Sequence, residues 1–121
     1  MTPERLPALV NDDPVLRRWG RHLDADMLLE VGPESWLLSL RDGQVAEVRK
    51  GPFLMPSWRF ALRSEAEAWR AFLSPEPPPG LHDLFALIRC GALRVEGDLH
   101  PFMSHILWFK GAFDALRSTM A

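Results

Sequence analysis

The segment from Gly80 to Phe113 constrains the fold most, because its apolar pattern predicts a helix, a strand and a second helix with almost no linker. Apolar residues at helical spacing predict the first helix over 81–89, and alternation of apolar and charged residues predicts a strand over 93–96. The second helix is expected to begin after Asp98, its N-cap, and to run to about Ser118. A unit of this kind needs a sheet or further helices to cover its apolar surface.

The last helix has more apolar surface than one packing face requires. Its expected core-facing positions are Leu99, Phe102, Met103, Ile106, Phe113 and Leu116. The turn Ile106–Phe109 is also apolar nearly all round, and a helix of that kind is buried on more than one side. Three environments explain this turn: packing between a sheet and another helix, a subunit interface, or the wall of a cavity that holds an apolar ligand. The residues alone leave all three open.

The middle of the chain is rich in strand signals. Short apolar runs predict strands over 27–31 and 36–41, followed by a returning strand over 44–49. Asp42-Gly43 stands between the last two strands and is a strong hairpin signal, because a tight turn needs residues that tolerate positive φ. The strand 57–63 alternates strictly and is expected to place three side chains inward: Trp58, Phe60 and Leu62.

Helices are predicted on both sides of these strands. Residues 1–13 are expected to form an arm, and Asp13-Pro14 has the residue types that begin a helix, here over 14–24. The stretch Ser64–Glu67 matches a capping box and predicts a helix over 65–73. Runs of strands and runs of helices together favour an α+β fold, a mostly antiparallel sheet covered by helices on one face.

Composition limits the class of protein. The 121 residues suit a single domain, 1–121. A net charge of −2 gives no basic surface for nucleic acid, and no apolar run reaches the roughly 18 residues of a membrane span, so neither a nucleic-acid partner nor stable membrane insertion is expected. Cys90 is the one cysteine, and the first residues do not resemble a secretory signal. These features predict a cytoplasmic protein.

The polar residues give little sign of catalysis. His100 and His105 are five residues apart, which does not place both on one helical face as a metal pair requires. An acid/base site of His82, Asp98 and His100 would need the beginnings of two helices to meet. Cys90 near a helix C-terminus is not an activated thiol, and no nucleophile, phosphate-loop or dinucleotide motif occurs. We therefore expect no enzyme activity, no metal and no cofactor.

The order of the motifs resembles a known family. A strand ends at Arg63, a helix of the type Ser64–Leu73 follows, and the pattern Gly91-x-Leu-x-Val-x-Gly-Asp98 then joins a helix, a strand and the last helix. This order resembles the sterol carrier protein 2 (SCP2) type of lipid-transfer domain over residues 24–118, and the stretch 82–101 resembles a bacterial branch of it. The resemblance implies a five-stranded sheet that, with its helices, encloses an apolar tunnel. It also implies binding or transfer of a sterol, a fatty acid or acyl-CoA without catalysis.

Two hypotheses about function follow. In the first, an internal cavity binds an apolar small molecule, and the expected ligand-binding residues are Phe53, Leu54, Met55, Trp58, Phe60, Leu84, Phe85, Ile88, Phe102, Met103, Ile106 and Phe109. The first three of these are expected at its mouth. In the second, the same fold has a filled core and serves as an accessory module or homodimer. Its contact surface would consist of Trp108, Phe109 and the apolar loop 51–56.

Overall fold

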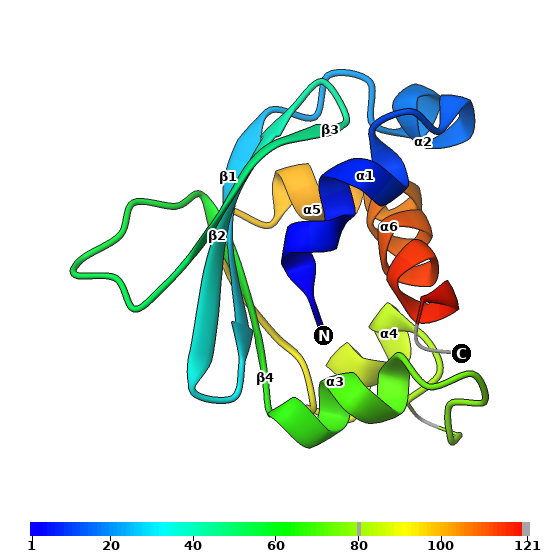
Figure 1. Ribbon diagram of the computed structural model, residues 1–121. Helices are drawn as coiled ribbons and strands as arrows, with labels where there is room; N and C mark the ends of the chain where they lie inside the picture. The colour runs from blue at the N-terminus through cyan, green and yellow to red at the C-terminus, as the bar shows by residue number, and fades with distance from the viewer. Residues whose placement is uncertain (80, 120–121) are drawn as a thin grey trace.

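A computed structural model describes residues 1–79 and 81–119 (Figure 1). Helices lie on one side of a five-stranded sheet, and the long loop between β3 and β4 projects on the other side. The elements in chain order are η1 Pro3–Arg5, α1 Leu6–Val10, α2 Pro14–Trp19, β1 Ala25–Val31, β2 Glu34–Arg41, β3 Gln44–Lys50, β4 Phe60–Ser64, α3 Ala66–Phe72, α4 Leu84–Arg89, β5 Arg94–Gly97, α5 His100–Ser104 and α6 Ile106–Ser118.

The sheet has the strand order β3-β2-β1-β4-β5. Three neighbouring pairs are antiparallel, and the central pair β1–β4 is parallel, with Met27 opposite Phe60. The parallel pair arises because residues 51–59 carry the chain from the edge strand β3 back to the middle of the sheet. The predicted α+β class, the five strands and the mostly antiparallel sheet are confirmed.

The predicted hairpin at Asp42-Gly43 is present, and both residues have positive φ, 49° and 75°. The turn also contacts the helices. A Cβ added to Gly20, which follows α2, would lie 2.4 Å from the Cα of Gly43. Trp108 of α6 donates its indole N–H to the carbonyl of Gly43 at 2.8 Å. Close backbone contact and one buried hydrogen bond therefore fix the hairpin against α2 and α6.

The N-terminal region differs from the prediction. Residues 1–13 are not an extended arm: they contain η1 and α1, and Leu6 and Val10 of α1 are buried in the core. The predicted helix 14–24 ends early, since α2 stops at Trp19 where Gly20 passes against the hairpin. Its N-cap is as expected, because the Asp13 carboxylate accepts hydrogen bonds from the backbone N–H groups of the first turn.

Two predicted caps are wrong. Ser64 is the last residue of β4, and its hydroxyl donates to the carbonyl of Ala92 at 2.6 Å, so it does not cap α3. Asp98 is not the N-cap of α5, because Leu99 occupies that position. The Asp98 carboxylate instead accepts from the His100 N–H at 3.1 Å in the preceding turn.

The predicted long last helix is divided at His105 into α5 and α6. One ring nitrogen of His105 lies 3.0 Å from the carbonyl of Pro101, and the other lies 3.1 Å from the carbonyl of Arg21. The helix 81–89 is also shorter than predicted, because Asp83 caps α4 by accepting from the N–H of Phe85. Among the described residues no helix is long and apolar enough to cross a membrane.

The two faces of the sheet carry different apolar clusters. The helix-covered face, with Leu38 of β2 and Phe60 and Leu62 of β4, belongs to one large core that includes side chains from α1 to α6. The loop-covered face has a small cluster, Leu28, Leu37 and Ala61, on which Phe53 and Trp58 pack.

Candidate functional site

The apolar layer between the helix-covered face and the helices is the candidate site. Alternation along the strands turns every second side chain toward the helices, as in Leu29 and Val31 of β1. The helices contribute large side chains from short amphipathic stripes, such as Trp69 and Phe72 of α3. Within the described residues, every buried residue named in the core is apolar, and no polar or charged residue is buried. The layer therefore suits an apolar ligand body, and the indole N–H groups of its tryptophans are its polar side-chain atoms.

Aromatic rings fill much of this layer. Phe60, Phe102 and Phe109 form a triangle with ring centroids 5.0 to 5.9 Å apart. Trp69 of α3 stacks on Phe113 of α6 with ring centroids 5.3 Å apart. These distances are those of favourable edge and stacked contacts, so the rings support one another as packing elements.

Half of the predicted ligand-binding residues meet in this layer. They are Phe60, Leu84, Ile88, Phe102, Ile106 and Phe109. Two others lie at its outside: Met103 is exposed, and Phe85 is half-buried with the Lys110 ammonium 4.6 Å from its ring centroid.

The remaining four lie elsewhere. Trp58 and Phe53 pack on the loop-covered face, so the prediction that Trp58 points inward with Phe60 is wrong. The physical reason is that β4 begins only at Phe60, and residues before it do not follow the alternation of the strand. Leu54 and Met55 are 95% and 91% exposed, at a bend of the loop between β3 and β4. That loop projects from the side of the sheet away from the helices (Figure 1). Leu54 and Met55 are not at the mouth of the apolar layer.

The predicted contact surface of the filled-core hypothesis is also partly wrong. Trp108 and Phe109 are each 1% exposed and therefore cannot contact a second subunit. The Ile106–Phe109 turn divides between two environments, since Leu107 is about half exposed. Packing between the sheet and neighbouring helices thus explains the two aromatic residues of that turn.

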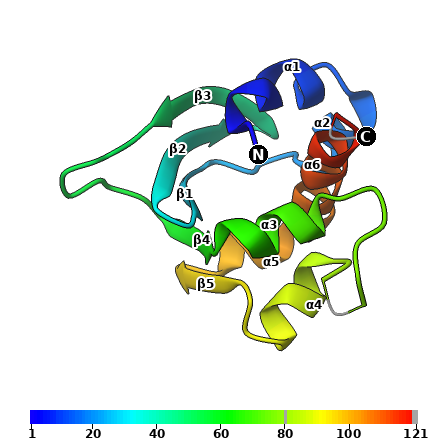
Figure 2. The same cartoon turned by 60° about the horizontal axis from the view of Figure 1, so that its bottom comes forward.

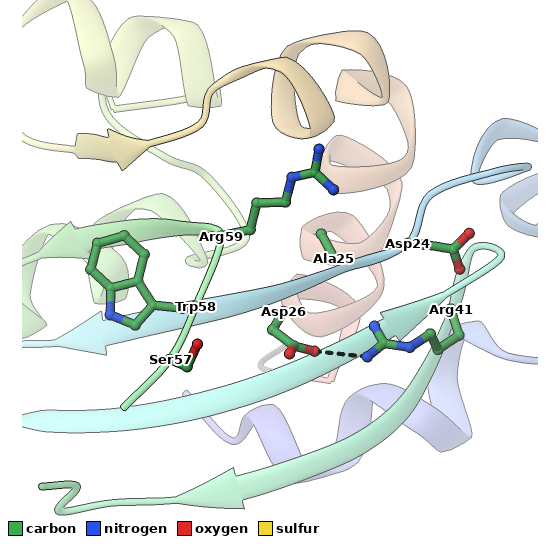
Figure 3. Close-up of a pocket in the computed structure, with 7 residues that line it drawn as sticks. All are labelled: Asp24, Ala25, Asp26, Arg41, Ser57, Trp58 and Arg59. Carbon is green, nitrogen blue, oxygen red and sulfur yellow. Dashed lines mark hydrogen bonds and ion pairs between the residues drawn. The ribbon is translucent and has the colours of Figure 1, made fainter. Parts of the chain in front are cut away.

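Two of the surface hollows lie at opposite ends of β1. One of about 340 Å³ is lined mainly by polar residues near the start of β1, and two of them, Asp26 and Arg41, form an ion pair at 3.1 Å (Figure 3). Its serine, Ser57, has no histidine beside it in this lining and forms no nucleophile pair. A smaller pocket of about 150 Å³ lies at the other end of β1 and β2. Its lining includes Trp36 and Trp69 of the apolar layer.

The candidate acid/base residues have structural partners. Asp98 forms an ion pair with Arg59 at 3.1 Å on the surface. The backbone N–H of His100, and then the Arg59 guanidinium, hold the pKa of Asp98 below its ordinary value. A carboxylate stabilised in its charged form is a poor general base. Over residues 1–79 and 81–119, no group of three or more His, Cys, Asp or Glu side chains is arranged to hold a metal ion.

Sequence reasoning missed Trp36 and Arg70, which line the smaller pocket. Trp36 alternates with Leu38 and Leu40 along β2, a pattern that would have placed it on the buried face. Its position beside α3 depends on pairing between strands distant in sequence, which the pattern does not reveal.

Comparisons with known proteins bear on the fold. A scan against protein-family models and a search of curated proteins found no match. A crystal structure of sterol carrier protein 2 matches with a TM-score of 0.77 and 13% identity, over 94% of this chain and 92% of that chain. A conserved hypothetical protein from Thermus thermophilus matches with a TM-score of 0.71 and 11% identity, over 93% and 82%.

The same fold forms part of a larger enzyme. In the sec-alkylsulfatase Pisa1 from Pseudomonas sp., the match has a TM-score of 0.57 and 17% identity, over 87% of this chain but only 15% of that chain. All of these identities are low, and the similarity lies in the arrangement of strands and helices. The five-stranded mixed sheet with helices on one face, matched over nearly the whole chain, shows that this protein has the SCP2 fold.

Proposed function

We propose that this chain binds an apolar lipid between the sheet and the helices, and carries or presents it without catalysing a reaction. The observation that carries the proposal is an SCP2 fold whose described buried layer contains no polar residue. An acyl or sterol body inserted there would leave water for apolar surroundings, which contributes roughly 25 cal/mol per Å² of buried apolar area. The ligand-binding residues we propose are the six that meet in the layer: Phe60, Leu84, Ile88, Phe102, Ile106 and Phe109.

The filled layer must open to admit a lipid. The pocket at its edge measures about 150 Å³, whereas sites for drug-sized ligands measure about 300–1,000 Å³. Separation of the rings in the Phe60–Phe102–Phe109 triangle would create the missing space. The free energy of this opening lowers the apparent affinity, because only the open fraction of molecules binds.

This reasoning gives a direct test with Phe109→Leu. The smaller side chain removes part of the opening cost, so the variant should bind palmitate or cholesterol several-fold more tightly than the unmodified chain, and about tenfold if 1.4 kcal/mol of that cost is removed. Phe53→Leu, on the loop-covered face, is the matched control and should leave affinity unchanged. Affinity is measured by tryptophan fluorescence on delipidated protein, and native mass spectrometry should show one ligand per chain.

A second candidate function is an accessory module or homodimer with a permanently filled core. Two observations favour it: the close aromatic packing of the layer, and three apolar side chains in and next to α5 and α6 that are about half exposed, Leu99, Met103 and Leu107. The occurrence of this fold within an alkylsulfatase also supports such a role. Absence of lipid from both the unmodified chain and Phe109→Leu, together with a dimeric mass, would reject lipid binding and support this alternative.

A further inference from the structure

The small pocket beside α3 joins the surface to the apolar layer. Its inner wall includes Val31, Trp36 and Trp69, and its rim includes Glu34 and Arg70. Figure 2 shows α3 beside the turn between β1 and β2, where this pocket lies. The N–H of Gly32 in that turn donates to the carbonyl of Ser64 at 2.8 Å, so the backbone on both sides of the pocket is fixed.

Trp36, one of the residues that line this pocket, has an unsatisfied hydrogen-bond donor. Its side chain is 3% exposed, and in the described part of the chain its Nε1 is the one buried side-chain nitrogen or oxygen without a partner. The two other fully buried tryptophans are satisfied: Trp69 donates to the carbonyl of Glu30 and Trp108 to that of Gly43, both at 2.8 Å. A buried donor without an acceptor is unfavourable and uncommon, so an acceptor from outside the chain, a water molecule or a ligand oxygen, would satisfy it.

The charges at the rim favour an anionic acceptor. Glu34 is paired with Lys50 at 2.9 Å, and the Lys50 ammonium lies 5.4 Å from the Trp36 ring centroid. Arg70 is exposed, lines the pocket and forms no ion pair with another described residue. Glu34 and Arg70 are the charged side chains of the lining, and Glu34 is already paired with Lys50, so Arg70 is the cation left to meet an anionic ligand. An arginine guanidinium matches a carboxylate well.

The register of the sheet connects this pocket to the proposed ligand-binding residues. Trp36 lies opposite Leu29, and Leu29 lies opposite Leu62, all on the helix-covered face. Phe60 lies two residues before Leu62 in β4, on the same face. The path from Trp36 to Phe60 therefore crosses about 10 Å of sheet and about 7 Å of strand, a span that suits a long acyl chain.

We propose that this pocket is the head-group site for the carboxylate of a fatty acid, with Trp36 Nε1–H donating to one oxygen and the Arg70 guanidinium pairing with the carboxylate. The acyl chain runs from there across Leu29 and Leu62 toward Phe60. The pocket, at about 150 Å³, has room for the polar end of the ligand and not for the whole ligand. This inference rests on the proposed lipid-binding function and specifies its ligand class.

The first test compares palmitate with its methyl ester, which keeps the chain but not the charge. Arg70→Gln should weaken palmitate binding about tenfold or more and change binding of the ester little, since charged hydrogen bonds typically contribute about that factor. Arg89→Gln, which removes an exposed arginine outside this pocket, is the matched control. Equal binding of palmitate by Arg70→Gln and the unmodified chain would reject the head-group site while leaving lipid binding intact.

The second test observes the indole N–H of Trp36 directly by NMR. In ¹⁵N-labelled protein titrated with octanoate, the Nε1–H resonance of Trp36 should move downfield, and those of Trp69 and Trp108 should stay, because they already have acceptors. Trp36→Phe assigns the resonance. A shift with octanoate in a chain that binds no palmitate would support the carboxylate site and reject the long-chain function. No shift of the Trp36 signal with saturating octanoate would overturn the inference.

Discussion

The two faces of the sheet differ in what covers their apolar side chains. The helix-covered face is completely buried at Leu29, Phe60 and Leu62 beneath side chains from several helices. The loop-covered face buries only Leu28, Leu37 and Ala61, under one loop whose Phe53 and Trp58 stay partly exposed. Both faces carry apolar side chains, but they differ in the thickness of the layer that covers them. That thickness decides whether a ligand has room.

The charges around the two clusters differ as well. On the loop-covered face Arg63 of β4 pairs with Glu30 of β1 and Glu96 of β5, and it also lies 5.6 Å from the Trp58 ring centroid. These partly exposed ion pairs place fixed charge beside the small cluster. A lipid tail there would have to displace them, which is why we assign lipid binding to the other face.

The largest expected effect tests this difference in depth. Phe102→Ala removes a ring that contacts both Phe60 and Phe109 and has no exposed area, so it should lower the free energy of unfolding by about 3–5 kcal/mol. Phe53→Ala removes a ring of equal size from the loop-covered face and should cost about 1 kcal/mol, because the ring is already partly in water. Urea unfolding of both variants measures the two values.

Equal losses in the two variants would mean that the loop packs as firmly in solution as the helices do. In that event the comparison between the faces would lose its basis. A loss for Phe102→Ala below about 1 kcal/mol would instead indicate that the aromatic triangle relaxes easily into the vacated space. The cost of opening the layer would then be small, and so would the gain in lipid affinity expected for Phe109→Leu.

A smaller effect is expected where the helix-covered layer closes at the hairpin. Gly20→Ala would place a Cβ 2.4 Å from the Cα of Gly43 and 2.5 Å from a ring atom of Trp108, and we expect it to cost about 1–3 kcal/mol. Gly111→Ala is the control: its Cβ would meet the far end of the Leu16 side chain, which can turn away. Removal of glycine from the interior of α6 also favours the helix.

Thermal unfolding of the two alanine variants checks this prediction. The Gly20 variant should melt below the unmodified chain, and the Gly111 variant should melt near it. The reverse order would show that the hairpin moves freely away from α2. The hairpin at Gly43 would then not close that end of the layer.

Local signals predicted much of this fold. The Asp42-Gly43 turn, the Asp13 cap of α2 and the mostly antiparallel sheet follow from turn chemistry, capping and strand alternation within a few residues of sequence. The helices and strands of the 80–113 segment appear in the predicted order, although His105 divides the last helix. Its two ring contacts reach Pro101 and the distant Arg21, and the second contact has no signal in the sequence.

Long-range contacts account for most of what the sequence did not reveal. A capping box at Ser64 was a reasonable expectation, but its hydroxyl bonds to Ala92, 28 residues away. Leu6 and Val10 are buried because α1 packs on the same core as α6. Of the site, the six core residues followed from apolar periodicity, while Trp36 and Arg70 required the structure. The single domain, the cytoplasmic location and the absence of a nucleic-acid partner stay predictions.

The smallest expected effect concerns the tip of the loop. Leu54→Ser and Met55→Ser change side chains that are almost fully exposed, so each should alter the free energy of unfolding by less than about 0.5 kcal/mol. Leu28→Ser, buried beneath the same loop, is the contrasting control and should cost several times more. A loss above about 1 kcal/mol at either tip residue that grows with protein concentration would show that the tip packs on a second chain. The loop-covered face would then be an interface, and the difference between the two faces would be one between an internal layer and an intermolecular one.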